Sequence, residues 1–175
     1  MNAPASAVSV AIVPSPLGPV RLLAQAGRLT GLYFVGQRDD PQAPEAPAQP
    51  DDQAVLERAR AQLAAYFSGS LKCFDLPLAL QGTPFQQQVW QALLTIPYGA
   101  TASYAGIALH CGRPKAVRAA GGAIGRNPVS IIVPCHRVIG RDGSLTGFGG
   151  GLERKQALLR LEGVLPATLA GFEAP

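Results

Sequence analysis

The stretch SYAGIALHCGRPKAVRAAGGAI, residues 103–124, decides the fold of the C-terminal half of the chain. Ser103 is a favoured helix N-cap, and a helix from there to His110 would be followed by Gly112, which suits the left-handed position after a helix end. Pro114 then opens a second helix, which we expect to continue to the end of the stretch. Two helices joined by a tight turn with a glycine predict a helix-turn-helix, and in DNA-binding examples the second helix enters a groove.

Small side chains dominate the second of these helices. Gly121 and Gly122 are adjacent in it, although each costs a helix about 1 kcal/mol relative to alanine. Close packing against another helix explains such residues, and so does a helix face that lies against the walls of a DNA groove. Arg118 would project from that face, and Ile107 and Leu109 of the first helix are the expected core positions.

Three short strands are predicted near the N-terminus, within residues 8–35. Val8, Val10 and Ile12 alternate with small or polar residues, turn residues follow at 15–19, and two further apolar runs complete the range. This pattern predicts a small antiparallel sheet.

A proline-spaced, acidic segment follows at residues 38–52. Its prolines recur at every third position, which is typical of polyproline II and incompatible with a helix or a central strand. The segment could bind an SH3-type domain, but acidic residues rather than arginines flank the prolines, so we interpret it as a stiff, exposed connector. Asp52 is the expected N-cap of a helix that runs to Phe67 and ends at Gly69.

A second, sharper helix signal lies in the middle of the chain. Alternating apolar residues at 74–80 predict a strand or an extended segment. Thr83, Pro84 and Gln86 then have the pattern of an N-cap, a first helical residue and the partner in a capping box. We expect the helix that follows to stop before the Pro-Tyr-Gly at 97–99.

Composition restricts the class of protein. Hydrophobic residues make up 47% of the 175 residues and charged residues 15%, so the chain can bury a core, and no run is long enough to span a membrane. With no export signal and no paired cysteine spacing, we expect free thiols in a reducing cytoplasm, and the two histidines lack a zinc-ligand spacing. The net charge of +4 is unevenly distributed. Residues 1–100 carry seven acidic and six basic side chains, whereas residues 101–175 carry four acidic and nine basic side chains.

A cysteine follows an apolar run that we expect to be a buried strand. Residues 130–133, SIIV, are mostly β-branched, and Pro134 ends the run directly before Cys135 and His136. A cysteine beside a histidine and Arg137 could serve as a thiolate nucleophile, because an isolated thiol is only slightly ionised at neutral pH. A small buried hydrophobe is the other interpretation.

Half of residues 140–151 are glycine. This segment has neither the ending of a phosphate-binding P-loop nor a dinucleotide fingerprint, so we expect it to line a pocket. A last helix is predicted from Leu152 to Glu162, before Gly163. Glu162 lies where the helix dipole disfavours a carboxylate, which makes it a candidate for a specific partner.

The chain resembles one protein family in a series of motifs that stand in the same order. VPCHRV at residues 133–138 resembles the active-site motif of the 6-O-alkylguanine-DNA alkyltransferases, or methylated-DNA–protein-cysteine methyltransferases, which include bacterial Ogt-like proteins. The resemblance is strong over residues 71–165 and weak in the N-terminal sheet, at 15–18. The other matching motifs are TPFQ (83–86), VW (89–90), IPYG (96–99), SY (103–104), KAVR (115–118), GGA (121–123), NP (127–128) and LEG (161–163).

This resemblance implies an α+β fold in two parts. A small ribonuclease H-like antiparallel sheet with a helix would form residues 1–80, and a mainly helical, winged helix-turn-helix-like alkyltransferase domain would form residues 81–175. It implies a monomer that acts on double-stranded DNA containing alkylated guanine, with no cofactor, no metal and no membrane partner.

The resemblance also implies roles for individual residues. Cys135 would take the alkyl group from the 6-oxygen of guanine, and from 4-O-alkylthymine as a second substrate, in an irreversible reaction that uses each molecule once. His136 would deprotonate the thiol through a water molecule and be held by Glu162. Asn127 would brace the turn that carries the thiol, and Tyr104 would donate a hydrogen bond to the leaving guanine and crowd a phosphate.

Two further groups of residues follow from the same resemblance. Arg118 would fill the gap that the flipped nucleotide leaves in the base stack, and the alkylated base would enter a pocket whose lip is the glycine-rich segment. Phe148 stands where many relatives have tyrosine, which leaves the range of accepted adducts open. The DNA-binding residues would be Arg118, Tyr104, Ala119, Lys115 and Gly121, and the pocket residues Phe148, Gly149, Val138 and Pro134.

Two other function classes compete with alkyl transfer. A non-catalytic binder of alkylated DNA would have the same fold but lack the cysteine, so the presence of Cys135 argues against it. A thiol hydrolase could use Cys135, His136 and Glu162 on acyl substrates, and turnover on an ester would distinguish it.

Overall fold

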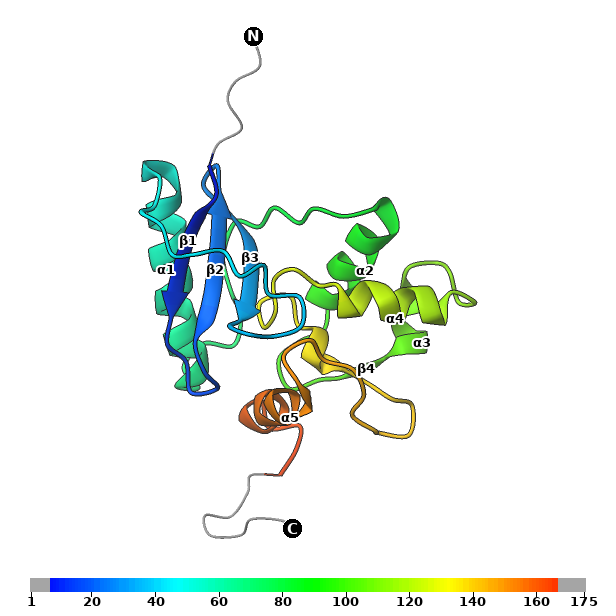
Figure 1. The fold of residues 1–175 in the computed structure, drawn as a ribbon. Helices are drawn as coiled ribbons and strands as arrows, with labels where there is room; N and C mark the ends of the chain where they lie inside the picture. The colour runs from blue at the N-terminus through cyan, green and yellow to red at the C-terminus, as the bar shows by residue number, and fades with distance from the viewer. Residues whose placement is uncertain (1–6, 167–175) are drawn as a thin grey trace.

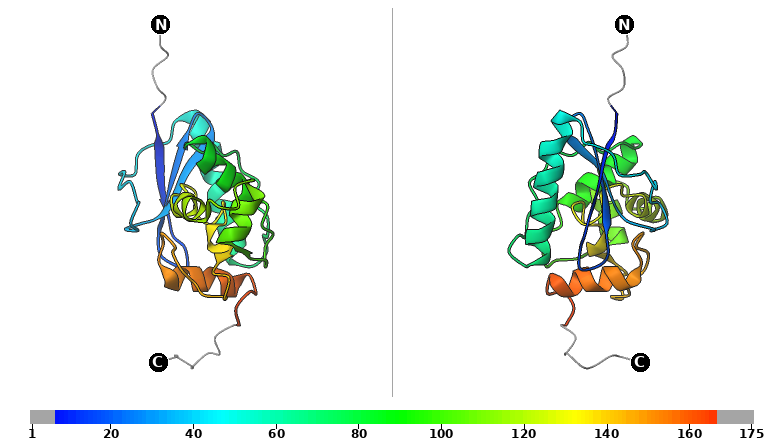
Figure 2. Two further views of the ribbon diagram at one scale, coloured as in Figure 1. Left: turned by 90° about the vertical axis from the view of Figure 1, so that its right-hand side faces the viewer. Right: turned by 60° about the vertical axis from the view of Figure 1, so that its left-hand side comes forward.

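The N-terminal part of the chain is a three-stranded sheet with one helix packed on it. The structure is a computed structural model and describes residues 7–166 (Figure 1). Strands β1 (Ser9–Val13), β2 (Val20–Gln25) and β3 (Arg28–Phe34) pair antiparallel in chain order, which confirms the predicted sheet. Helix α1 (Pro50–Phe67) packs against this sheet, and the helical half of the molecule lies on the other side (Figures 1 and 2).

Helix α1 begins earlier than predicted. Gln49 is its N-cap, Pro50 is its first residue and Asp52 lies within the first turn, so the expectation that Asp52 caps the helix was wrong. Proline is pre-organised for the first helical position, where no N–H partner is needed. The Asp52 carboxylate instead accepts hydrogen bonds from Ser9 Oγ at 2.7 Å and Gly27 N at 2.8 Å, and so ties the sheet to the helix.

The acidic segment before α1 is anchored to the sheet. Asp40 forms a buried ion pair with Arg21 of β2, and Arg21 Nε also donates to the Ala43 carbonyl at 2.7 Å. Further along, Ala46 N donates to Val10 O of the edge strand β1 at 3.2 Å. Most of the segment is exposed, as predicted. These contacts add what the proline spacing did not show: the connector covers part of the open edge of β1.

The C-terminal half contains the predicted helix-turn-helix. Helix α2 (Pro84–Leu94) begins with the predicted capping box, in which Thr83 Oγ1 accepts from Gln86 N and the Gln86 side chain accepts from Thr83 N. Helices α3 (Tyr104–His110) and α4 (Val117–Gly125) form the motif and pack on α2. Ala120 and Ala123 of α4 are buried in this packing, whereas Gly121 is half-buried and Gly122 is exposed, so close helix packing does not account for the two glycines.

Two details of the motif differ from the prediction. Helix α4 begins at Val117 rather than at Pro114, because residues 113–116 form a hydrogen-bonded turn before the helix. Leu109 is 65% exposed, so its assignment to the core was wrong, whereas Ile107 is buried as predicted. Helix α3 is only two turns long, and its inward side holds one large apolar side chain.

The apolar run before the cysteine is buried but is not a strand. Ile131 has a positive φ of 72° and Val133 N donates to Val129 O at 3.0 Å, so residues 130–133 form consecutive turns. Asn127 determines this shape: Nδ2 donates to Val133 O at 2.7 Å, and Oδ1 accepts from Val129 N at 3.0 Å. The strand prediction was wrong because the backbone groups of Ile132 and Val133 bond within the turns and to Asn127, while contact with a strand is limited to Ser130 N, which donates to Leu32 O of β3 at 3.1 Å.

The remaining elements complete the predicted α+β architecture. The 3-10 turn η1 (Cys135–Arg137) leads into β5 (Val138–Ile139), which pairs in parallel with β4 (Ala102–Ser103). Helix α5 (Leu152–Leu161) crosses one end of the molecule (Figure 2). Residues 74–80 are extended, as predicted, and contact β3 through one parallel bridge. Within residues 7–166, no helix is long and apolar enough to cross a membrane.

Candidate active site

Cys135 begins the turn η1 and is almost completely buried, with 7% of its surface exposed. Burial raises the pKa of its thiol, while the Asn127 side chain and the positive charge of Lys155 act in the opposite direction. The other free cysteines lie elsewhere: Cys73 is exposed and Cys111 is half-buried. Cys135 is therefore the thiol with the polar surroundings that a nucleophile needs.

His136 and Glu162 form the buried pair that the resemblance implies. Nε2 of His136 lies 2.8 Å from Oε1 of Glu162, and both side chains are fully buried. Burial lowers the pKa of His136, against the raising effect of Glu162. Burial alone would raise the pKa of Glu162, but hydrogen bonds from His136, Arg137 and Tyr66 lower it to about 2. A carboxylate can only accept, so Nε2 carries the imidazole proton and Nδ1 presents a lone pair.

Nδ1 of His136 is buried and has no hydrogen-bond partner among the described residues. Since Nε2 is held by Glu162, Nδ1 is the nitrogen that can take a proton. His136 directly follows Cys135, so the lone pair belongs to the same short turn as the thiol. This geometry provides a neutral base with a fixed tautomer next to a nucleophile.

Two residues for which the sequence predicted no contact with Glu162 also hold its carboxylate. Arg137 donates from Nε to Oε2 at 2.9 Å and from Nη2 to Oε1 at 2.8 Å, and its Nη1 donates to Ile96 O at 2.7 Å. Tyr66, far away in α1, donates its hydroxyl to Oε1 at 2.8 Å. The position of Arg137 beside Cys135 and His136 was a usable signal, whereas nothing in the sequence marks Tyr66.

Lys155 is a buried cation that the sequence motifs also missed. Its side chain, on α5, is completely buried, and Nζ donates to Val138 O at 2.6 Å and to Thr146 O at 2.9 Å. Burial lowers its pKa, and the neighbouring Cys135 thiolate would favour the charged form. Lys155 thus joins the glycine-rich segment to the strand after the active-site turn. Its place in α5, shortly after the glycines, is the only sequence signal it has.

Two of the predicted pocket residues, Phe148 and Gly149, lie within the glycine-rich segment. The Tyr104 hydroxyl donates to Thr146 O at 2.7 Å, and a Cβ built on Gly147 would lie 3.7 Å from that hydroxyl. Phe148 packs edge-on against Phe34 of β3, with ring centroids 6.5 Å apart. Gly147 has a φ of +58°. Of the other predicted pocket residues, Pro134 and Val138 are buried and Gly149 is half-buried.

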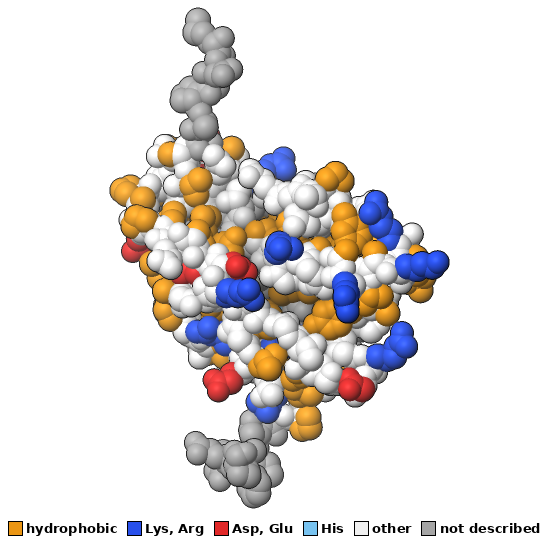
Figure 3. Space-filling view, turned by 45° about the vertical axis from the view of Figure 1, so that its right-hand side comes forward, with side chains coloured by type: hydrophobic (Ala, Val, Ile, Leu, Met, Phe, Trp, Pro, Cys, Tyr) orange, Lys and Arg blue, Asp and Glu red, His pale blue; other side chains and the backbone are white. Residues whose placement is uncertain are grey.

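The predicted DNA-binding residues lie on the helix-turn-helix. Lys115, Arg118 and Ala119 are exposed on the turn and first part of α4, and Gly121 faces the Tyr104 ring. Figure 3 shows that Lys and Arg side chains outnumber Asp and Glu on the face over the helical half. The uneven charge along the sequence therefore corresponds to a basic surface in space.

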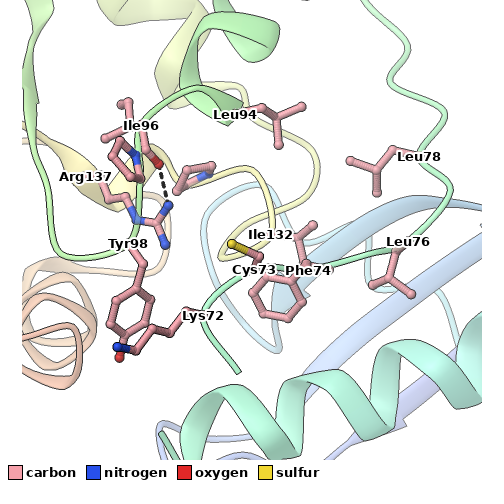
Figure 4. Close-up of a pocket in the computed structure, with 12 residues that line it drawn as sticks. Lys72, Cys73, Phe74, Leu76, Leu78, Leu94, Ile96, Tyr98, Ile132 and Arg137 are labelled. Atoms are coloured by element: carbon pink, nitrogen blue, oxygen red, sulfur yellow. Dashed lines mark hydrogen bonds between the residues drawn. The ribbon is translucent and has the colours of Figure 1, made fainter. Parts of the chain in front are cut away.

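A separate cavity lies next to the active-site turn. It has a volume of about 320 Å³ and is lined mainly by apolar residues; Arg137 lies in its wall (Figure 4), and Pro134, Lys72 and Cys73 are among its other lining residues. The bond from Arg137 to Ile96 O crosses this wall (Figure 4). Cys135 is not among its lining residues, so this cavity is distinct from the pocket expected at the thiol.

Comparison with known proteins relates both halves of the chain to one family. The family model described as "6-O-methylguanine DNA methyltransferase, DNA binding domain" matches residues 84–164, and the one described as "6-O-methylguanine DNA methyltransferase, ribonuclease-like domain" matches residues 9–80. Both descriptions agree with the resemblance that the sequence motifs carry.

Individual relatives agree with these models. The methylated-DNA–protein-cysteine methyltransferase of Mycobacterium tuberculosis is 50% identical over 162 residues, 92% of this chain and 96% of that protein. The protein of the same name from Methanosarcina acetivorans is 49% identical over 154 residues, 87% and 97% of the two chains. A crystal structure of M. tuberculosis OGT in complex with DNA matches with a TM-score of 0.80 and 50% identity, covering 89% of this chain and 92% of that one. The chain belongs to the 6-O-methylguanine DNA methyltransferase family.

Proposed function

We propose that this protein repairs alkylated DNA by transferring the alkyl group from the 6-oxygen of guanine to the sulfur of Cys135. The observation that carries the assignment is the buried thiol next to the His136–Glu162 pair, on a chain that also carries a basic helix-turn-helix. Its relatives are named methylated-DNA–protein-cysteine methyltransferases, and a crystal structure of one relative is in complex with DNA. The partner is therefore double-stranded DNA that contains an alkylated base.

The proposed chemistry is a displacement at the alkyl carbon. The thiol proton passes to Nδ1 of His136, through a bridging water, as the sulfur attacks. The S–C bond forms, the C–O bond to guanine breaks, and Tyr104 donates a hydrogen bond to the leaving guanine, as the family resemblance implies. The guanine anion then takes up one proton from solvent, and the imidazolium of His136 returns one to solvent. Glu162 stabilises the imidazolium that forms, and Arg137 keeps that carboxylate ionised. A thioether is not released by water, so each molecule reacts once, and no step calls for a cofactor.

DNA must be deformed for this reaction, because the alkyl carbon is inaccessible inside a duplex. Flipping a nucleotide costs a few kcal/mol, and side chains inserted through the minor groove supply such deformations. We assign the inserted side chain to Arg118, which is exposed near the start of α4, with Lys115, Ala119 and Gly121 against the backbone. Tyr104 stands beside this helix, where the flipped base would enter.

The site also limits what the pocket accepts. Phe148, Gly149, Val138 and Pro134 would contact the base and the alkyl group. Phe148 has no hydroxyl, so it offers the base an apolar edge. We further propose that residues 1–80 and 81–175 are separate domains, and that 4-O-alkylthymine is a second substrate.

The competing classes have less support. A non-catalytic binder needs no thiol, yet Cys135 is present with a base and a buried carboxylate, and the named relatives are methyltransferases. The hydrolase hypothesis rests on the same Cys135, His136 and Glu162, and the family match does not support it.

Transfer of label tests the proposal. Duplex DNA with a radiolabelled methyl group on the 6-oxygen of one guanine is incubated with the protein, and mass spectrometry locates the adduct. We expect one label per chain, on Cys135, and none in the Cys135→Ala variant. Cys111→Ala is the matched control and should transfer normally, since Cys111 lies outside the site. Label on another residue, or many turnovers on an ester, would overturn the assignment.

A further inference from the structure

Tyr66 connects the N-terminal part of the chain to the candidate catalytic residues through a hydrogen bond. It lies in α1, 96 residues before Glu162, yet its hydroxyl donates to Glu162 Oε1 at 2.8 Å. The side chain is completely buried, and its ring packs against Phe67, Phe74 and Tyr98. Ring packing would be equally satisfied by phenylalanine, so the hydroxyl is the part that needs an explanation.

The two carboxylate oxygens of Glu162 accept different numbers of hydrogen bonds. Oε1 accepts from His136 Nε2, Arg137 Nη2 and the Tyr66 hydroxyl, whereas within residues 7–166 Oε2 accepts only from Arg137 Nε. The end of α5 has another anchor, since the Tyr98 hydroxyl donates to Leu161 O at 3.1 Å. The helix end thus has an anchor that does not involve Tyr66. The Tyr66 hydroxyl acts on the same oxygen that binds the imidazole.

We propose that Tyr66 is a positioning residue for alkyl transfer: its hydroxyl draws charge from Glu162 Oε1 and so keeps His136 neutral, with Nδ1 free to take the thiol proton. This inference rests on the proposed function. A donor on Oε1 weakens that oxygen as an acceptor for Nε2–H, and a weaker Nε2–H bond stabilises the imidazolium less.

The other charged and titratable groups around His136 and Glu162 shift the pKa values of the site in defined directions. Arg137 of η1 and Lys155 of α5 lower the pKa of His136, and Glu162 raises it. Burial and the Glu162 charge raise the pKa of Tyr66, so it remains a donor throughout the working range. Tyr98 and Cys135 complete the surroundings, and Tyr98 bonds a backbone carbonyl rather than the carboxylate.

The test is the pH dependence of transfer in Tyr66→Phe. Reaction of Cys135 with free 6-O-benzylguanine is followed from pH 5 to pH 9, which separates the chemistry from DNA binding. On the acid side of the curve of transfer rate against pH, the rate falls as His136 becomes protonated. We expect this acid limb to move to higher pH by about half a pH unit in Tyr66→Phe. Transfer should then be roughly threefold slower at pH 6 and unchanged above pH 8. Tyr33→Phe, in β3 and away from Glu162, is the matched control that should leave the limb in place.

Other outcomes separate the inference from the proposed function. An equal loss of rate at every pH, or a limb that does not move, overturns the role of Tyr66. Absence of transfer in the unmutated protein overturns the proposed function instead.

A direct measurement covers the case in which Tyr66→Phe is too unstable to assay. The chain has only two histidines, and His110 is exposed, so the ring carbon signals of His136 can be followed by NMR with His110 as an internal reference. Incorporation of 3-fluorotyrosine strengthens the hydroxyl as a donor without removing it. We expect the pKa of His136 to fall in the fluorinated protein, and no change, or a rise, would refute the proposal.

Discussion

Replacing Glu162 by glutamine should destabilise the fold and also change how its stability depends on pH. Glu162 is buried, with 5% of the residue exposed, and its pKa is lowered from 4.5 to about 2. A pKa change of one corresponds to about 1.4 kcal/mol, so ionised Glu162 contributes about 3 kcal/mol near neutral pH. Removing one partner of a buried ion pair independently suggests about 3–5 kcal/mol, because Arg137 would stay buried without its counter-charge.

The sign of the pH dependence follows from the depressed pKa. Stabilisation by Glu162 is fully present above the pKa of the unfolded chain, near 4.5, and is lost as the pH falls towards 2. The difference in unfolding free energy between the unmutated protein and Glu162→Gln should therefore be about 3 kcal/mol at pH 7 and shrink by most of that amount at pH 2.

Urea unfolding at a series of pH values measures this difference. Glu153→Gln is the matched control, since Glu153 is an exposed carboxylate on the same helix, α5, and should shift stability by less than about 0.5 kcal/mol. A Glu162→Gln protein as stable as the control at pH 7, or a difference that does not depend on pH, would refute the reasoning. A general loss of helix α5 would lower stability without this pH signature.

Four further changes test other parts of the site. Asn127→Ala leaves two buried backbone groups without partners and should cost about 2–4 kcal/mol in urea unfolding, with slower transfer. Lys155→Met removes a charge that lowers the thiol pKa, so the alkaline limb of the transfer rate should move to higher pH, as a stopped-flow pH profile would show. Arg118→Ala should slow repair of duplex DNA much more than reaction with free benzylguanine, and equal losses would contradict its role in flipping. Methylation of Cys135 adds a carbon to a buried, packed site and should lower stability by about 1–3 kcal/mol, measurable as a lower thermal midpoint.

Local signals in the sequence predicted most of the fold. The capping box at Thr83, the left-handed glycine at Gly112 and the alternation in residues 8–35 correspond to a helix start, a helix end and a sheet. These features succeed because their energetics involve residues only a few positions apart. Asp52 failed as an N-cap because its partners, Ser9 and Gly27, come from the sheet.

The candidate site was predictable only where a motif carries it. Cys135, His136 and Glu162 were found through family motifs, and the structure places the latter two in contact. Lys155 and Tyr66 were missed because each acts through long-range hydrogen bonds from an ordinary helix. A buried lysine or tyrosine has the same sequence pattern as a lysine or tyrosine at any other helix position.

The Glu162 carboxylate links the active-site turn to the contacts that hold the two halves of the chain together. Glu162 accepts from His136 and Arg137 of the active-site turn and from Tyr66 of the N-terminal helix, and Arg137 also binds the backbone after α2. A disturbance at Cys135, which precedes His136 and Arg137 in the same turn, would therefore be passed to bonds that link α1, α5 and the backbone after α2. The same coupling operates in reverse, because any change in how α1 packs moves the hydroxyl that shares Oε1 with the imidazole. For this reason the N-terminal part of the chain, which supplies neither the thiol nor the DNA-binding helix, still contributes to the reactivity of the site.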